Sequence, residues 1–97
     1  DINGAKAVFV EDGDLSHPAV MEPAPYDLVF ANILARPLIE LAPAITRLMT
    51  ADGRAILSGL LRTQESEVLE AYEALGFAVE QTIHHDAWSA LLLKRGG

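Results

Sequence analysis

An apolar segment spans residues 27–33 and reads DLVFANI, with little alternation of polar and apolar side chains. A strand with one solvated face alternates, whereas a nearly continuous apolar run is typical of a parallel sheet covered by helices on both faces. Shorter apolar segments occur at 7–10, AVFV, and at 54–59, RAILSG, and turn-forming residues adjoin both. The sequence therefore predicts an α/β fold with its strands buried under helices on either side.

A helical pattern follows the central apolar segment. Pro37 suits the first turn of a helix. Apolar residues then recur at helical spacing: Leu38, Leu41, Ala42, Ile45, Leu48 and Met49. Because Pro43 has no amide hydrogen and its ring crowds the carbonyl of Ile39, we expect a break or kink near Ala42.

A second helix is predicted after a turn at 50–53, TADG, and the strand that follows it. Thr63 is expected to cap this helix, and Glu65 and Glu67 lie near its positive end. Gly76 is expected to end it, because glycine tolerates the left-handed conformation of a helix C-terminus. One side of this helix carries the apolar residues Val68, Leu69, Tyr72 and Leu75.

The chain ends in two strand-like segments, 77–85 (FAVEQTIHH) and 87–95 (AWSALLLKR), with only Asp86 between them. So short a connection cannot hold a parallel crossover, so the two segments are predicted to form an antiparallel hairpin. Residues 15–25 contain three prolines and no periodic pattern, which indicates a loop. The predicted order is strand, loop, strand, helix, strand, helix, hairpin.

Composition excludes several classes of function. The chain has 97 residues, enough for one domain, and a formal net charge of −7 with its seven basic residues scattered along the sequence. Such a surface does not favour a nucleic-acid backbone as a partner. There is no cysteine, no apolar run of membrane-spanning length and no signal-peptide pattern. We therefore expect a cytoplasmic protein that binds neither membrane nor nucleic acid.

Asn32 places a carboxamide near the end of the segment 27–33. Ligands of open α/β sheets bind beyond the carboxyl ends of the strands. A carboxamide can accept a hydrogen bond from an amine and donate one to a carboxylate, which suits a ligand that carries both groups. Considered on the residues alone, however, Asn32 more simply stabilises its own turn.

Other polar and aromatic residues give weaker signals. His84, His85 and Asp86 could suggest a metal site, but adjacent strand residues point to opposite faces, so we predict that no metal binds there. His17 lies in the proline-rich loop without a partner that the sequence can place, and we assign it no role. Trp88 is predicted to have a packing role on the antiparallel strand, since an indole buries a large area.

The chain contains, in this order, the segments VFVEDGDL, YDLVFANILARPLIELAP, GRAILSGLL, YEALGF and AWSALLLKR. This succession resembles the C-terminal part of the class I S-adenosylmethionine-dependent methyltransferases, and within them the ribosomal protein L11 methyltransferase (PrmA) family. The resemblance runs from about Asn3 to Arg95. Its most specific part is ANILA followed by PLIELAP.

The resemblance implies a Rossmann-like sheet of seven strands in the order three, two, one, four, five, seven, six, with strand seven antiparallel. Residues 1–97 would then be the C-terminal portion of the catalytic domain and contain strands three to seven. Strands one and two would lie outside this chain, together with the glycine-rich loop and the acidic residue that bind the cofactor, and with the N-terminal substrate-recognition domain.

The resemblance also assigns candidate site residues. It makes Asn32 the catalytic residue and a contact for the methionine part of the cofactor. It places Asp14 near the adenine amino group, with Leu15 against the adenine ring. Asp12 is an alternative to Asp14, since both belong to the same turn-like segment.

The implied function is methyl transfer from S-adenosylmethionine to amines of a ribosomal protein, with the isolated fragment inactive and binding the cofactor weakly. The alternatives are a non-enzymatic Rossmann-like interaction module and a methyltransferase with another substrate. Without strands one and two, the edge of 27–33 would be unpaired. We therefore expect either that residues 7–10 dock on it or that two chains self-associate through it.

Overall fold

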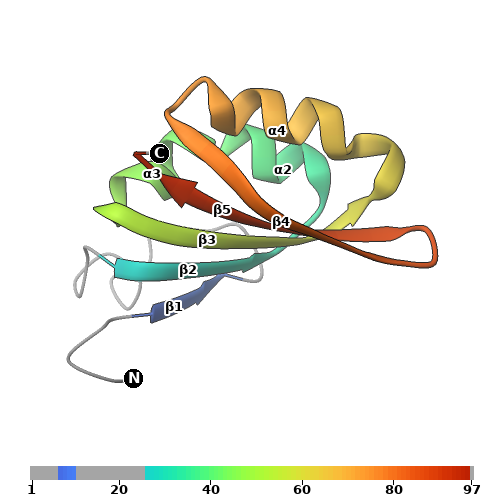
Figure 1. Ribbon diagram of the computed structural model, residues 1–97, viewed down its shortest axis with the longest axis horizontal. Coiled ribbons are helices and arrows are strands. Elements are labelled where there is room, and N and C mark those ends of the chain that lie inside the picture. The colour runs from blue at the N-terminus through green and yellow to red at the C-terminus, as the bar shows by residue number, and fades with distance from the viewer. Residues whose placement is uncertain (1–6, 11–25, 97) are drawn as a thin grey trace.

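The computed structural model describes residues 7–10, for their backbone, and 26–96. These residues form one five-stranded sheet in the order β1-β2-β3-β5-β4 (Figure 1). Its strands are β1 (Ala7–Val10), β2 (Tyr26–Asn32), β3 (Met49–Leu61), β4 (Phe77–His85) and β5 (Trp88–Arg95). The helices are α2 (Ala35–Glu40), α3 (Ala42–Arg47) and α4 (Glu65–Glu73), and the 3-10 turn η1 (Arg62–Gln64) precedes α4. The predicted α/β order of elements is confirmed.

β1 docks directly on β2. The two strands are parallel, with Ala7 opposite Leu28 and Val10 opposite Ala31. This is the first of the two arrangements expected for the edge of β2. It supplies hydrogen-bond partners to the edge of β2 that faces away from β3. Self-association of two chains stays a prediction.

The helices that the structure describes cover β2 on one side only (Figure 1), which differs from the prediction of helices on both faces. Val29 and Ala31 are buried, whereas Leu28 and Phe30 on the opposite face are half-buried. All the helices of the described residues lie on the same side of the sheet (Figure 1). The continuous apolar run therefore does not correspond to a strand enclosed by the described helices.

The predicted break in the first helical segment is confirmed. α2 ends at Glu40, Leu41 forms a turn, and α3 begins at Ala42 with Pro43 in its first turn. Pro43 is tolerated there because the amides of a first helical turn have no intrahelical acceptor.

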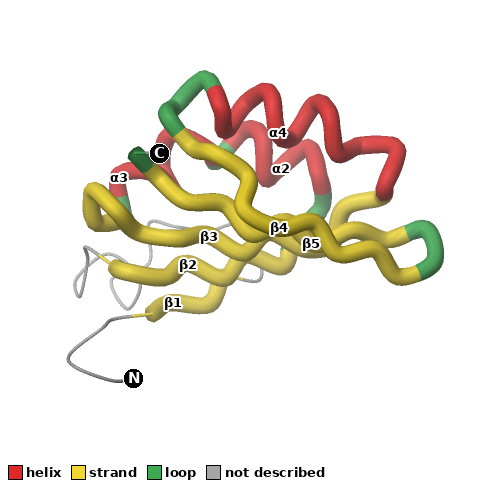
Figure 2. Tube along the Cα trace, viewed as in Figure 1, coloured by secondary structure: helices red, strands yellow, loops and turns green. Residues whose placement is uncertain are grey.

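The predicted turn at 50–53 is wrong. Met49, which the helical spacing had included in the first helix, instead begins β3, and the strand continues to Leu61. The register with β2 shifts from Tyr26 opposite Met49 to Leu28 opposite Arg54, so β3 accommodates the turn-forming residues as an irregularity of the ladder (Figure 2).

The start of α4 differs from the prediction, and its end agrees with it. Thr63 lies within η1 and does not cap α4; instead, the Gln64 side-chain oxygen Oε1 accepts a hydrogen bond of 2.8 Å from the Leu61 amide. Glu65 belongs to the first turn of α4, as expected. Gly76 has a φ of 96°, the left-handed conformation predicted for the helix end.

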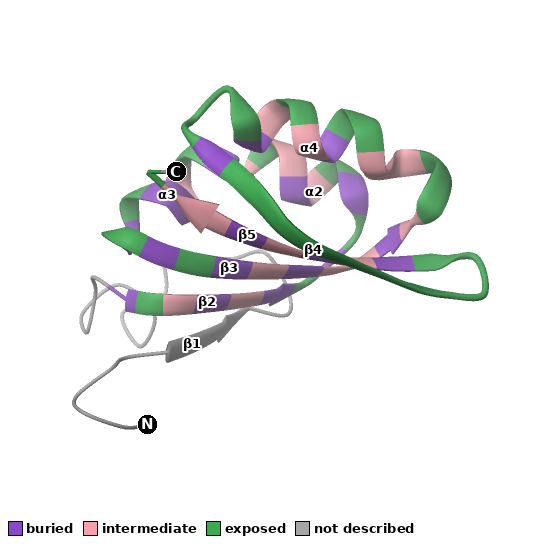
Figure 3. Cartoon of the chain, viewed as in Figure 1, coloured by how far each residue is buried: buried purple, intermediate pink, exposed green. Residues whose placement is uncertain are grey.

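The hairpin of β4 and β5 is antiparallel, as predicted. Asp86 turns the chain with a positive φ of 54°. β4 is largely exposed, whereas buried residues recur along β3 and β5 (Figure 3). Consequently the core lies between the centre of the sheet and the helices that cover it.

Tyr72 joins α4 to α2 in this core. Its side chain is fully buried, and its hydroxyl donates a hydrogen bond of 2.8 Å to the Leu38 carbonyl of α2. Its ring meets that of Phe77 edge to face, with centroids 5.4 Å apart. Burial raises the pKa of Tyr72, because the charged phenolate would be desolvated.

Within the described part of the chain, no helix has the length and apolar character needed to span a bilayer.

Candidate functional site

β2 and β3 end side by side at the carboxyl edge of the parallel strands. Their last register pair is Asn32 and Ser58, which places both polar side chains at the mouth of a pocket of about 310 Å³. The pocket is lined by Asn32, Ser58, Gly59, Ile83, His85, Trp88, Ser89 and Ala90. It therefore combines two polar groups from the parallel strands with a wall supplied by the hairpin.

Asn32 is exposed at the end of β2, where its carboxamide can reach a ligand. Its oxygen Oδ1 accepts a hydrogen bond of 3.0 Å from the Ser58 hydroxyl. The amide nitrogen Nδ2 makes no hydrogen bond to any residue that the structure describes. Asn32 is therefore held by the neighbouring strand rather than by its own turn, and its N–H groups remain able to donate.

Gly59 gives the ends of the two strands room to approach each other. Its φ is 89°, and a Cβ added to it would lie 2.7 Å from the Ile33 carbonyl oxygen and 3.1 Å from Oδ1 of Asn32. Real Cβ atoms do not approach backbone oxygens so closely. Glycine is thus needed both for its conformation and for the space beside Asn32.

Trp88 is one of the candidate site residues that the sequence prediction missed. It was expected to have only a packing role on the antiparallel strand, but 49% of its surface is exposed. Its side chain lines both the Asn32 pocket and a second hollow of about 350 Å³, which Leu34 and Pro37 also line. Its position next to the turn of the hairpin was the available signal, because residues near a turn lie at an end of the sheet.

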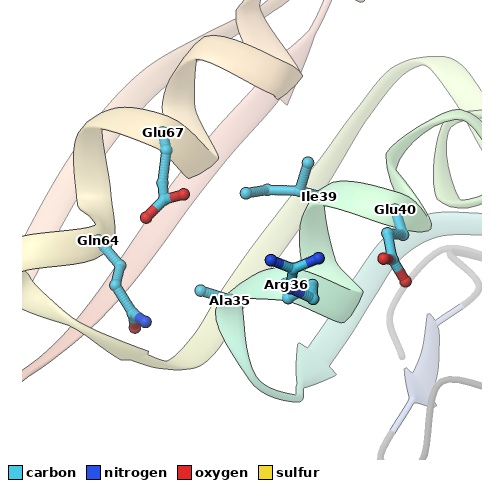
Figure 4. Close-up of a pocket in the computed structure, with 6 residues that line it drawn as sticks. All are labelled: Ala35, Arg36, Ile39, Glu40, Gln64 and Glu67. Atoms are coloured by element: carbon cyan, nitrogen blue, oxygen red, sulfur yellow. The ribbon is translucent and has the colours of Figure 1, made fainter.

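A third hollow, of about 390 Å³, lies between α2 and the start of α4 (Figure 4). Glu67 and Gln64 extend towards it from α4 and η1, and Ala35 and Ile39 face them from α2. Gln64 and Ala35 also line the second hollow. The three hollows therefore follow one another along the same edge of the fold.

The other predicted cofactor contacts, Asp14 and Leu15, lie outside the described residues, as do the alternative Asp12 and the unassigned His17. The structure brings Asn32 together with Ser58, Gly59 and Trp88, and none of these three was among the predicted site residues.

The histidines of the hairpin have separate environments. His84 contacts the Glu65 carboxylate of α4 through Nε2, whereas His85 lies 3.7 Å from Asp86 at the exposed turn. No group of three or more possible metal ligands occurs in the ranges that the structure describes. The two imidazoles are therefore not arranged to bind a common ion.

Ser89 lies beside the His84–Glu65 pair and is buried, but its hydroxyl makes no hydrogen bond to a described residue. The hydroxyl is nevertheless close enough to the Glu65 carboxyl to lower the pKa of that group. The hydrogen bond and the charge of His84 lower this pKa further, whereas burial raises it. Ser89 and His84 both act on the carboxylate, so the three residues do not have the order of a catalytic triad, in which the imidazole contacts the hydroxyl.

We expect the Glu65 interaction to stabilise the protein at neutral pH and to weaken in acid. Because the folded state lowers the pKa of Glu65, its contribution is present above the unfolded-state value of about 4.5 and is lost as the pH falls through the folded-state pKa. In urea denaturation, Glu65→Gln should be less stable than the wild type at neutral pH, and the difference should shrink below about pH 4.5.

Glu70→Gln is the matched control for this experiment. Glu70 lies on the same helix, is exposed, and makes no ion pair with a described residue. Its variant should differ little from the wild type at either pH. A Glu65→Gln difference that persists unchanged in acid would show that the ionised carboxylate contributes nothing to stability.

A family model and several known proteins match almost the whole chain. The family model described as ribosomal protein L11 methyltransferase (PrmA) matches residues 2–96. The ribosomal protein L11 methyltransferase of Caulobacter sp. (strain K31) is 56% identical over 94 residues, which cover 97% of this chain and 33% of that protein. The protein of the same name from Brucella suis is 46% identical over 78 residues, or 80% of this chain and 27% of that protein.

A solved structure has a similar fold. The crystal structure of ribosomal protein L11 methylase from Lactobacillus delbrueckii subsp. bulgaricus superimposes with a TM-score of 0.76 and 26% identity, covering 97% of this chain and 60% of that one. The present chain spans about a third of the length of the curated relatives it matches.

Proposed function

The chain belongs to the ribosomal protein L11 methyltransferase family, and on this premise we propose that it is the C-terminal portion of an enzyme that methylates amines of that ribosomal protein. The share of its relatives that it spans agrees with a portion of a longer catalytic chain. Its sheet would then contain the equivalents of strands three to seven of the class I methyltransferase fold.

The observation that carries the proposal is the exposed Asn32 carboxamide at the carboxyl edge of the parallel strands, beside a pocket. This edge is where open α/β sheets bind their ligands. The free N–H groups of Asn32 fit the carboxylate of the methionine part of the cofactor, and the second lone pair of Oδ1 fits an amine N–H. Asn32 would thus contact both reactants.

S-adenosylmethionine supplies the methyl group: the amine nitrogen forms the new C–N bond with its lone pair, and the sulfonium keeps the electrons of the C–S bond that breaks. The product ammonium loses a proton to solvent. Such a displacement needs a neutral amine held in line with the methyl group, so the protein contributes mainly by positioning and by excluding water. Asn32 would provide part of that positioning, and the apolar surface of Trp88 borders the same pocket.

Further contacts to the cofactor would come from segments that the structure does not describe. The family resemblance assigns the adenine contacts to Asp14 and Leu15, with Asp12 as the alternative. The glycine-rich loop and the ribose-binding acid would belong to the region preceding this chain, as would the domain that recognises the ribosomal protein. We propose a cytoplasmic location, where that substrate is synthesised.

The test is a methylation assay with the full-length enzyme that contains this chain, using methyl-labelled S-adenosylmethionine and ribosomal protein L11. The full-length protein should label amines of L11. The isolated 97-residue chain should give no turnover, and calorimetry should detect only weak cofactor binding by it. Labelling of a different acceptor in place of L11 would contradict the proposed substrate, and absence of any transfer would contradict the proposed activity.

A further inference from the structure

Ser58 is bonded to the end of β2 in two ways. Its hydroxyl donates to Oδ1 of Asn32 over 3.0 Å, and its backbone carbonyl accepts from the Ile33 amide over 3.2 Å. We propose that Ser58 is a positioning residue, whose hydroxyl fixes the orientation of the Asn32 carboxamide for methyl transfer. The inference rests on the proposed function and goes beyond it, because it assigns a role to a residue of the neighbouring strand.

The need for such a residue follows from the exposure of Asn32. A carboxamide at an exposed strand end can rotate about its side-chain bonds, and a rotation of half a turn exchanges its donor and acceptor sides. The Ser58 bond holds Oδ1 against β3. One lone pair of that oxygen and both N–H groups of Nδ2 then remain for ligands, in a fixed arrangement.

The surrounding backbone supports this arrangement. Asn32 and Ser58 are direct register partners, so the two parallel strands bring the side chains together without a long flexible reach. The position that a Gly59 Cβ would occupy lies 3.1 Å from the same Oδ1, so the absence of a side chain there leaves the oxygen room to bond to Ser58. The sequence pair Ser58-Gly59 therefore provides both the donor and the clearance.

The two bonds of Ser58 can be separated by mutation. Ser58→Ala removes the hydroxyl but keeps the backbone carbonyl that accepts from Ile33, so the strand pairing should persist. Loss of one hydrogen bond that preorganises a reacting group should lower kcat about five- to tenfold. Ser58→Thr keeps a hydroxyl on the same carbon atom and should restore most of the rate.

Thr50→Ala is the matched control. Thr50 also lies on β3, and its hydroxyl donates to Asp27 of β2 over 3.3 Å at the opposite end of the same strand pair. The Ser58 and Thr50 variants each remove one exposed hydroxyl bond between β2 and β3. They should change the melting temperature to a similar small extent, whereas only Ser58→Ala should lower kcat.

A double-mutant cycle in the full-length enzyme tests whether Ser58 acts through Asn32. In an Asn32→Ala background, Ser58→Ala should have no further effect on kcat, because the group that it orients is gone. Effects that multiply would overturn the inference, since they would indicate that Ser58 acts independently of Asn32. A wild-type kcat for Ser58→Ala would overturn it as well.

A second measurement keeps this test separate from that of the proposed function. The side-chain amide of Asn32 should give one well-defined pair of NMR signals in the wild type and motionally averaged signals in Ser58→Ala. If the wild type methylates L11 but the amide is equally mobile in both proteins, the positioning role is wrong while the proposed function stands. If the wild type methylates nothing, the proposed function fails and the positioning role of Ser58 in methyl transfer fails with it, whatever the amide signals show.

Discussion

Asn32→Ala should lower the methylation rate of the full-length enzyme on the order of 100-fold, because misplacing the reacting groups by about an ångström costs that much in rate. The protein should remain nearly as stable as the wild type. Asn32 is exposed, and so is the hydrogen bond that its side chain accepts from Ser58, which is itself half-buried. Surface substitutions of this kind change the free energy of unfolding by about 0.5 kcal/mol or less. Initial rates and thermal unfolding of the same preparations measure the two effects.

Gln81→Ala is the control for Asn32→Ala. Gln81 is another exposed carboxamide of the same sheet, on β4, and it lines none of the three hollows along the edge of the fold. Its variant should retain both rate and stability. Should Asn32→Ala keep its full rate while its melting temperature falls sharply, Asn32 would be a structural residue and the site would have to be sought elsewhere.

Gly59→Ala should destabilise the protein more than Asn32→Ala or Ser58→Ala does. Gly59 has a φ of 89°. Holding a residue with a side chain in this left-handed conformation lowers the free energy of unfolding by about 1–3 kcal/mol. The new methyl group would in addition meet the Ile33 carbonyl oxygen at 2.7 Å. To relieve this contact the end of β2 must move, and Asn32 moves with it. The variant should therefore lose both free energy of unfolding, measured by urea denaturation, and methylation rate.

Gly76→Ala separates the two causes. Gly76 also has a positive φ, of 96°, but a Cβ added there meets nothing within 4 Å. Its variant should lose only the conformational part, about 1–3 kcal/mol, and should keep its activity. If the two variants lose equal stability and Gly59→Ala stays fully active, the close approach of Gly59 to β2 has no energetic consequence.

The sequence determined those features of the fold that depend on a single residue and its immediate neighbours in the chain. Pro43 lacks the amide that a continuous helix needs, so the break near Ala42 was predictable. Gly76 could end α4 because only glycine adopts its conformation at little cost, and the single residue Asp86 between two strand-like segments required an antiparallel hairpin. The carboxamide of Asn32 at a strand end also indicated the candidate site, because ligands of α/β sheets bind at that edge.

Only the tertiary structure decided features that depend on what lies beside a residue. Residues 50–53 have turn-forming side chains, yet they lie within β3, between Met49 and Arg54, which both pair with β2. The sequence predicts a packing role for Trp88, but 49% of its surface is exposed because it lies at the end of the sheet. Ser58 and Asn32 are 26 residues apart in the chain, and it is the parallel register that makes them partners. Periodicity and turn chemistry act over a few residues, whereas register and burial are set by contacts between distant segments, so the sequence alone determined the locally caused elements and the candidate residue Asn32, and the fold decided the partners of Asn32 and the course of β3.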